Sequence, residues 1–294
     1  MLTASQLRQV AGRSGARDIG NVEIDVILTY LLQLFHEKKI TEHVAFKGGT
    51  MLRKMTFGPR GRLSTDLDFT YYTTIDADDL MLDALREPYH GVSFRFDRDK
   101  DWYMTEDGIA ANPVCSHAGN AKGVKIKLQV SMREKPILSV TPLPQLDQDY
   151  FGLLPFKPSS IPSLAFEEVV AEKIRAASQR SKIRDIHDLS EIAVRPLKRE
   201  VIRSLAVLKL WDTTGPNLSY DQLRARVTGD ADYDVADLTN LLRKDQRLDM
   251  ESMIRRVVDG FRFLEDLTEL ERVLVQDDAR RHQEQAEELR SSLL

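Results

Sequence analysis

Apolar residues recur at helical spacing near the start of the chain and then alternate with polar ones. Residues 22–39 carry apolar side chains three and four positions apart, which predicts a helix, and Asn21 suits its N-cap position. HVAFKGG (43–49) predicts a short strand that runs into a glycine turn, and TMLRKMTF (50–57) predicts the start of a helix. DLDFTYY (66–72) alternates polar and apolar side chains, as a half-buried strand does.

The pattern changes from strands to helices near residue 160. After a predicted helix at 76–85, strand-like segments separated by Gly, Asn and Asp occupy 91–132. Residues 133–163 contain six prolines, which predicts an extended connection with room for an edge strand. Ser163 is the predicted N-cap of the helical part, which ends in a highly charged, exposed helix at 277–294. The order of elements predicts an α/β (α+β) fold with a mixed sheet, followed by helices.

Length and composition narrow the class of protein. The chain has 294 residues, of which 42 % are hydrophobic and 30 % are charged, so we expect a globular protein with two domains, 1–160 and 161–294. Cys115 is the only cysteine, which excludes disulfides within the chain and cysteine-rich zinc sites. The apolar run 26–35 is too short to span a membrane and the N-terminus lacks a signal-peptide pattern, so we expect a cytoplasmic protein without a membrane partner. The net charge of −4 confines any nucleic-acid site to a local basic patch.

Two carboxylates in the predicted strand 66–72 point to metal chemistry. Asp66 and Asp68 are two positions apart, so on a strand their side chains lie on one face, while Leu67 and Phe69 lie on the other. Neighbouring like charges repel unless they share a cation or stay in water. Hard carboxylate oxygens suit Mg²⁺, which usually keeps several waters and binds substrate phosphates as well.

The glycine turn before this strand is suited to phosphate binding. Gly48 and Gly49 lack a Cβ, so their backbone N–H groups can approach a phosphate closely, and Thr50 adds a hydroxyl. Lys47 and Arg53 supply positive charge nearby. Each half alone is also typical of a surface turn or an exposed acidic strand end, but their order along the chain favours a joint site.

These residues carry a resemblance to a known family. KGGTMLRK…RLSTDLDF resembles the nucleotidyltransferase superfamily with a polymerase-β-like core, and more narrowly the AbiEii/MenT family of nucleotidyltransferase toxins. The family motif matches Lys47, Gly48, Gly49, Thr50, Arg62, Ser64, Asp66, Asp68 and Phe69, with GPRG (58–61) as an extra loop. A second motif, in a helix about a hundred residues later, matches Glu172, Lys173, Ala176, Arg180, Arg184, Asp185, Asp188 and Leu189. The resemblance covers roughly residues 40–195.

The resemblance implies an activity and partners. It implies a nucleotidyltransferase core with N-terminal helices in 1–160, and a helical domain in 161–294 that contributes nucleotide-binding residues. It further implies a Mg²⁺-dependent toxin of a toxin–antitoxin or phage-defence system, which adds nucleotides from NTP to the 3′ acceptor end of tRNA, releases pyrophosphate and blocks translation. The implied partners are NTP, tRNA and a cognate antitoxin, either a kinase or a winged-helix protein.

The resemblance also implies a role for each matched residue. The implied catalytic residues are Asp66, Asp68, Lys173 and Asp185, and the implied metal ligands are Asp66 and Asp68. The implied nucleotide-binding residues are Lys47, Gly48, Gly49, Thr50, Ser64, Arg180 and Arg184. Ser64 is the implied site of a silencing phosphorylation, and on a strand it would share a face with Asp66 and Asp68, so we expect its hydroxyl to point toward the same site. From the residues alone, Lys173, Arg180, Lys182 and Arg184 form either a triphosphate-binding cluster or a solvated basic helix face.

One departure from the superfamily keeps other functions open. Related enzymes often place a third carboxylate on a later core strand, where this chain has Gln129 in VKIKLQV. Glutamine cannot act as a base or balance the charge of a metal, so the general base is not assigned from this strand. Transfer to a protein or a small molecule, and a non-catalytic protein with a degenerate metal site, are the alternatives.

Overall fold

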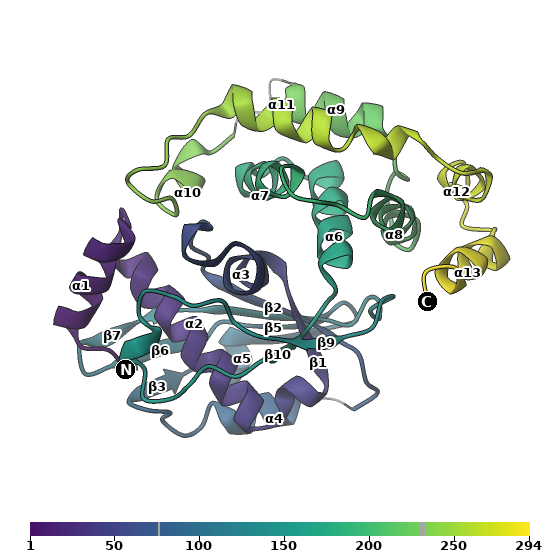
Figure 1. Ribbon diagram of the computed structural model, residues 1–294. Coiled ribbons are helices and arrows are strands. Elements are labelled where there is room, and N and C mark those ends of the chain that lie inside the picture. The colour runs from purple at the N-terminus through teal and green to yellow at the C-terminus, as the bar shows by residue number, and fades with distance from the viewer. Residues whose placement is uncertain (76, 230–232) are drawn as a thin grey trace. The chain divides into compact units, whose positions relative to one another are not determined.

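The computed structural model describes residues 1–75, 77–229 and 233–294 (Figure 1). The chain forms two compact units and passes between them more than once. The first unit comprises Met1–Pro136, Val140–Leu164 and Asn240–Arg247, and the second comprises Ile137–Ser139, Ala165–Thr239 and Leu248–Leu294. The fold is mixed α/β, as the sequence predicted.

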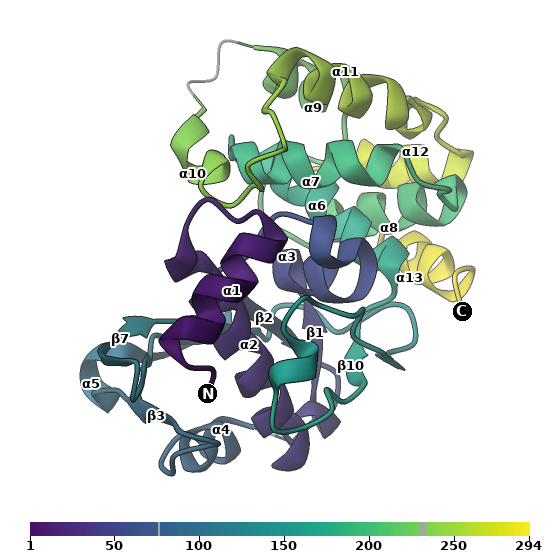
Figure 2. The ribbon, with the colours of Figure 1, turned by 60° about the vertical axis from the view of Figure 1, so that its left-hand side comes forward.

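The first unit contains five α-helices in the described residues. They are α1 (Ala4–Ser14), α2 (Ile19–Glu37), α3 (Gly48–Met51), α4 (Asp78–Ala84) and α5 (Arg98–Asp101). Helix α3 continues directly into a π-helical segment, Leu52–Phe57, and short 3₁₀ turns cover Ile40–Glu42, Gly58–Arg60 and Phe151–Leu153. Helix α1 packs beside α2 (Figure 2).

Two predicted helix boundaries in this unit were inexact. Helix α2 begins at Ile19 rather than at residue 22, because Asp18 and not Asn21 caps it, with the carboxylate accepting from the N–H of Gly20 at 2.8 Å. The predicted helix 76–85 corresponds to α4, and residue 76 lies outside the described residues.

A seven-stranded mixed sheet forms the centre of the first unit. Its strand order is β4-β5-β8-β2-β1-β10-β9, with β1 antiparallel and β8 parallel to the central β2. The strands are β1 (Val44–Lys47), β2 (Asp66–Tyr71), β4 (Trp102–Thr105), β5 (Gly108–Ala111), β8 (Lys127–Ser131), β9 (Thr141–Leu143) and β10 (Ile161–Ser163). A separate antiparallel sheet has the order β3-β6-β7, formed by Val92–Arg95, Val114–His117 and Asn120–Lys125.

The two faces of the large sheet differ in chemistry. Phe46, Leu67 and Phe69 are fully buried on one face, where Phe35 of α2 lies 5.9 Å from Phe69 between ring centroids. Because side chains alternate along a strand, Asp66 and Asp68 lie on the opposite face from Leu67 and Phe69. Burial of the aromatic face therefore holds both carboxylates on the other side of the sheet.

The proline-rich connection supplies two strands at one edge of the sheet. β9 is an edge strand, as predicted, and β10 pairs with both β9 and β1. The expected N-cap at Ser163 was wrong, because Ser163 belongs to β10 and its hydroxyl donates to the carbonyl of Ile161. Helix α6 begins later, at Phe166, after Ala165, which makes no side-chain cap.

All regular secondary structure in the described residues of the second unit is helical. Its helices are α6 (Phe166–Gln179), α7 (Ile183–Ala193), α8 (Arg199–Trp211), α9 (Tyr220–Thr228), α10 (Val235–Thr239), α11 (Met250–Gly260), α12 (Glu269–Val275) and α13 (Gln283–Ser291), with a 3₁₀ turn at Arg262–Glu265. Buried Glu168 on α6 pairs with Lys209 of α8 at 2.7 Å and accepts the backbone N–H groups of Ile137 and Leu138. This carboxylate anchors the short segment 137–139 to the second unit.

The predicted exposed helix at 277–294 is shorter and better packed than expected. Helix α13 covers only Gln283–Ser291, and Ala286 and Leu289 on it are buried. Among the described residues, no helix combines the length and apolar character needed to cross a membrane.

Candidate active site

The glycine turn after β1 lies directly against the acidic strand. Gly48 adopts a positive φ of 78°, a conformation that disfavours side chains. A Cβ at this position would lie 2.3 Å from Oδ2 of Asp68, well inside van der Waals contact. Glycine therefore allows the backbone to approach the Asp68 carboxylate.

The next two positions contact the segment that leads into β2. A Cβ at Gly49 would lie 2.7 Å from Nη2 of Arg62 and 3.4 Å from Oγ of Ser64. The hydroxyl of Thr50 donates to the backbone carbonyl of Asp66. The turn and the acidic strand thus form one local structure, in which Gly48, Gly49 and Thr50 each face a different part of residues 62–68.

Ser64 was expected on the same strand face as the two aspartates, and this detail was wrong. Strand β2 begins at Asp66, and Ser64 lies in the irregular segment before it. Its hydroxyl nevertheless faces the glycine turn, because Oγ is 3.4 Å from the Cβ position of Gly49. The side chain is buried, with 5 % of the residue exposed.

Cross-strand register places basic and amide side chains beside the two carboxylates. Asp68 is opposite Lys47 on β1 and opposite Gln129 on β8. Asp66 is opposite Lys127 on β8, and Oδ1 of Asp66 accepts from the hydroxyl of Thr65 at 3.0 Å. Gln129 therefore lies beside Asp68, where the third acid of related enzymes was expected. Lysines flank both aspartates and reduce their mutual repulsion.

The carboxylate oxygens of Asp66 and Asp68 fit a hard divalent cation that takes its remaining ligands from outside the protein. Asp66 and Asp68 are both partly exposed and present carboxylate oxygens from one face of β2. Within the described part of the chain, no group of three or more His, Cys, Asp or Glu side chains is placed to hold a metal ion. A two-carboxylate site matches Mg²⁺, which binds through one or two carboxylates and takes its other ligands from water and substrate phosphates.

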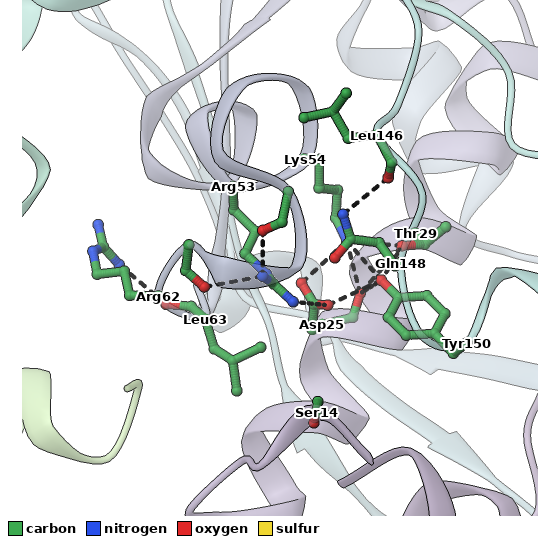
Figure 3. A network of polar contacts seen from close by, with 12 residues as sticks. Ser14, Asp25, Thr29, Arg53, Lys54, Arg62, Leu63, Leu146, Gln148 and Tyr150 are labelled. Atoms are coloured by element: carbon green, nitrogen blue, oxygen red, sulfur yellow. Dashed lines mark hydrogen bonds and ion pairs between the residues drawn. The ribbon is translucent and has the colours of Figure 1, made fainter. Parts of the chain in front are cut away.

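Arg53 is not at the glycine turn, contrary to the expectation from sequence. It is 4 % exposed and its Nη2 pairs with Asp25 of α2 at 3.5 Å. The neighbouring Lys54 is fully buried and donates to Asp25, Thr29 and Tyr150 at 2.8–3.1 Å (Figure 3). The helical segment after α3 is therefore tied to α2 through its basic residues, which cannot also face a phosphate.

Charge attraction dominates at the centre of this buried network. Burial alone would raise the pKa of Asp25, but attraction to Lys54 and Arg53 outweighs it and lowers that pKa. Burial lowers the pKa of Lys54, against the opposing effect of Asp25. Burial and the charge of Asp25 raise the pKa of Tyr150, so its hydroxyl stays protonated and donates to the carboxylate at 3.0 Å.

In the second unit, Lys173 lies between two carboxylates. Its Nζ is 3.0 Å from Oδ1 of Asp185 and 2.7 Å from Oδ2 of Asp188. Arg180 also pairs with Asp185, at 2.8 Å. Burial would raise the pKa of Asp185, but Lys173 and Arg180 lower it overall, so this carboxyl is charged at neutral pH.

Three residues of the basic cluster predicted around α6 and α7, Lys173, Arg180 and Arg184, are ion-paired, although the Arg180 side chain also remains exposed. Lys173 is 9 % exposed, and Arg184 pairs with Asp237 of α10 at 2.9 Å. Lys182, the N-cap residue of α7, is exposed.

Sequence reasoning left one residue of the site without a role. Arg62 was matched to the family motif, but its contact with Gly49 depends on the path of residues 58–63, which no periodicity predicts. The signal in the sequence was the second glycine of the pair. Gly49 has no positive φ in the structure, and it leaves the space that the guanidinium occupies.

Comparison with known proteins gives one family and several similar structures. The family model described as "Nucleotidyl transferase AbiEii toxin, Type IV TA system" matches residues 30–284. Among solved structures, the chain is similar to MenT4, a nucleotidyltransferase toxin from Mycobacterium tuberculosis H37Rv, with a TM-score of 0.80, 24 % identity, and coverage of 100 % of this chain and 99 % of that chain. It is also similar to JHP933 from Helicobacter pylori, with a TM-score of 0.52, 17 % identity, and coverage of 94 % and 98 %. At these identities the two structures show the fold alone. No curated protein matches the chain.

Proposed function

Since the chain belongs to the AbiEii family of nucleotidyltransferase toxins of type IV toxin–antitoxin systems, we propose that it transfers nucleotides from NTP to the 3′ acceptor end of tRNA. The reaction releases pyrophosphate, and the extended tRNA can no longer be aminoacylated, so translation stops. The proposal places the reaction at Asp66, Asp68 and the Gly48–Thr50 turn.

One observation carries the assignment of this site. The Gly48 backbone lies against the carboxylate of Asp68, where any side chain would clash at 2.3 Å. A surface turn beside an unrelated acidic strand has no need for such an approach. A site that binds phosphates and a cation together does, because backbone N–H groups and carboxylates must then face the same ligand.

The chain's own groups have separable tasks in this proposal. Backbone N–H groups of Gly48, Gly49 and Thr50 bind the phosphates, and Lys47 adds positive charge from the end of β1. Asp66 and Asp68 would hold Mg²⁺, which when bound supplies charge neutralisation to the triphosphate. Catalysis of this kind consists mostly of positioning and electrostatic stabilisation, so the fixed backbone of the turn contributes directly.

The ion-paired residues of the second unit complete the proposal. We assign Lys173 to the negative charge that develops on the leaving pyrophosphate, and Arg180 and Arg184 to nucleotide binding. Asp185 orients or deprotonates the attacking hydroxyl, since Gln129 cannot act as a base. The lowered pKa of Asp185 keeps it ionised but makes it a weak base, which favours orienting the hydroxyl over deprotonating it.

Substitution of Lys173 by arginine is expected to abolish most transfer while preserving the fold. Arginine retains the positive charge between Asp185 and Asp188, but a planar fork cannot reproduce the position of an ammonium group. Lys173→Ala should lose transfer and stability together. Its free energy of unfolding should fall by about 3 kcal/mol, because the substitution removes a buried partner of two carboxylates. The measurements are the initial rate of transfer and the thermal midpoint.

Lys198→Ala is the matched control, because Lys198 pairs with Glu167 at 2.9 Å but is exposed, where an ion pair contributes little. A Lys173→Arg protein with the wild-type transfer rate would restrict Lys173 to holding the two carboxylates.

The acceptor is tested with tRNA whose 3′ end has been destroyed. Periodate oxidises the terminal cis-diol of tRNA and removes the 3′ hydroxyl, while the rest of the molecule stays intact. With α-labelled triphosphates, we expect label in untreated tRNA and none in oxidised tRNA. Raising the salt concentration should reduce transfer steeply, because contacts to phosphates weaken with salt. Equal label in oxidised tRNA, or label in protein alone, would contradict the acceptor assignment.

We further propose that phosphorylation of Ser64 silences the site. A phosphate adds about −1.5 to −2 charges at pH 7, and here it would stand beside Gly49 and compete with the substrate phosphates. Ser64→Glu should therefore be inactive and Ser64→Ala active, in the same transfer assay. Since Ser64 is buried, a kinase can reach it only when residues 62–65 move outward.

Thr74→Glu serves as the control. Thr74 is exposed, so this substitution introduces the same charge at a position away from the turn. If the protein phosphorylated on Ser64 transferred nucleotides at the wild-type rate, the proposed silencing by phosphorylation would be wrong.

A further inference from the structure

The face of the large sheet that holds the two aspartates continues past them to the β4 edge. Cross-strand register places Asp68 opposite Gln129 of β8, and Gln129 opposite Ala110 of β5. Ala110 is in turn opposite Tyr103 of β4. Residues directly opposite each other in a sheet point to the same face. These four residues therefore form one row across the sheet, three strand spacings or about 14 Å long.

The burial pattern agrees with this register. Trp102, Ile109 and Leu128 precede three members of the row along their strands, and all three are buried on the core face. The two middle members of the row are partly exposed, and Tyr103 at the edge is 49 % exposed. The tyrosine ring therefore lies outside the core, on the side of the sheet that carries the site.

The tyrosine ring is restrained and accessible from the site. Its hydroxyl donates to the backbone carbonyl of Lys100 in α5, which limits the orientations of the ring. Ala110 beside it has only a methyl group, so no large side chain of the row stands between the ring and Gln129. Aromatic side chains presented in this way are the platforms on which bases of single-stranded RNA stack.

The geometry of the proposed reaction decides which substrate meets this part of the face. The strand order places β1 on one side of β2 and β8 on the other. The Gly48–Thr50 turn continues β1, so the phosphates assigned to it lie on the β1 side of Asp68. In phosphoryl transfer the attacking and leaving oxygens are roughly in line with the phosphorus between them. Pyrophosphate then leaves towards the turn, and the acceptor hydroxyl approaches from the side of β8, β5 and β4.

A basic residue lies on the same side. Lys127 of β8 is exposed and opposite Asp66, so its side chain lies on the face of the two aspartates. An ammonium group at this place can neutralise a backbone phosphate of an RNA strand. The face thus offers an aromatic ring and a positive charge, the two features by which proteins bind single-stranded nucleic acid.

We infer that this face binds the unpaired 3′ end of the acceptor RNA, with a base stacked on Tyr103 and a backbone phosphate at Lys127. The inference rests on the proposed function, because it takes Asp68 and the glycine turn as the reacting site. It adds the place of the acceptor strand beside that site. Since every base has a π-face, stacking on Tyr103 holds the strand without selecting its sequence.

The test measures the Kd of tRNA by fluorescence anisotropy without triphosphate, and the KM values of tRNA and NTP in the transfer assay. Tyr103→Ala is expected to raise the Kd and the KM of tRNA about tenfold, because alanine offers no surface for stacking. The KM of NTP should not change. Tyr103→Phe keeps the ring and should lose less than threefold in affinity. Met104→Ala is the matched control, because Met104 is the next residue of β4, 53 % exposed, and lies on the opposite face.

Salt dependence separates the two contacts. The slope of log Kd against log salt concentration reports the number of phosphates that the protein neutralises. Lys127→Ala should reduce this slope by about 0.7, the value for one phosphate of a single strand. Tyr103→Ala should weaken binding with the slope unchanged, because a stacked base releases no counterions. An unchanged slope in Lys127→Ala would contradict the phosphate contact.

The outcomes also separate this inference from the proposed function. If wild type transfers nucleotides to tRNA and Tyr103→Ala has the wild-type Kd and KM for tRNA, the acceptor face is wrong and the proposed function stands. A raised KM of NTP with an unchanged KM of tRNA would assign the ring to the incoming nucleotide and would likewise contradict the inference. If wild type transfers to no RNA, both fail.

Discussion

Replacement of Asp68 by alanine is expected to lower nucleotide transfer at least about a thousandfold. The proposed metal neutralises charge worth several kcal/mol in the transition state, and each 1.4 kcal/mol corresponds to about tenfold in rate. Asp66→Ala should have an effect of the same order, because both carboxylates lie on the same face of β2. Transfer is measured as initial rate with α-labelled triphosphate and tRNA.

The stability of these variants should be close to that of wild type. Asp68 is partly exposed and lies beside Asp66 and opposite Lys47, so the repulsion relieved and the attraction lost on its removal oppose each other. Asp79→Ala, which removes an exposed carboxylate from α4, controls for the change in net charge and should transfer normally. A folded Asp68→Ala protein with a rate within tenfold of wild type would show that the site is elsewhere.

The largest effect on stability is expected at Asp25. Asp25→Ala leaves Lys54 and Arg53 buried without their carboxylate, and breaking a buried pair in this way costs roughly 3–5 kcal/mol. For a protein of this size the thermal midpoint should fall by about 10 °C. Asp18→Ala, which removes only the N-cap of the same helix, should cost about 1 kcal/mol.

The pH dependence of Asp25→Asn identifies the buried charge as the cause. Burial lowers the pKa of Lys54 below its ordinary value of 10.5, and without Asp25 no carboxylate opposes that effect. Between the lowered folded pKa and 10.5, the unfolded chain binds more protons than the folded one, so stability increases with pH. We therefore expect Asp25→Asn to recover stability relative to wild type as the pH is raised towards 10.5. A constant difference between the two proteins over this range would exclude a buried lysine charge as the cause.

The strand and turn of the site were predictable because their signals are local. Alternation over 66–72 placed Asp66 and Asp68 on one face, and β2 has that pattern of burial. The glycine pair predicted a close backbone approach, and Gly48 makes it to Asp68. Period-two alternation and glycine geometry depend on a few neighbouring residues, so they can be detected in a single sequence.

The role of Arg53 was not predictable for the opposite reason. Its charge suggested a phosphate contact, but the carboxylate that binds it comes from Asp25, twenty-eight residues earlier on α2. The eight residues Asn240–Arg247 similarly belong to the first unit, although helices of the second unit surround them in the sequence. Long-range partners of this kind leave no periodicity in the chain.

The predicted boundaries of helices and strands were wrong where tertiary contacts determine the N-cap of a helix or the first residue of a strand. Ser163 had the composition of an N-cap but pairs within the sheet as part of β10. Ser64 was expected on a strand that in fact begins two residues later. In both cases the chemistry of the residue was recognised and its backbone conformation was not.

The most direct measurement is a crystal structure with Mg²⁺ and an α,β-methylene triphosphate, which cannot be cleaved at the reacting bond. The account predicts a metal ion at about 2.1 Å from carboxylate oxygens of both Asp66 and Asp68. It also predicts phosphate oxygens within hydrogen-bond distance of the N–H groups of the Gly48–Thr50 turn. A triphosphate bound away from this turn, with no metal on Asp66 or Asp68, would contradict the account.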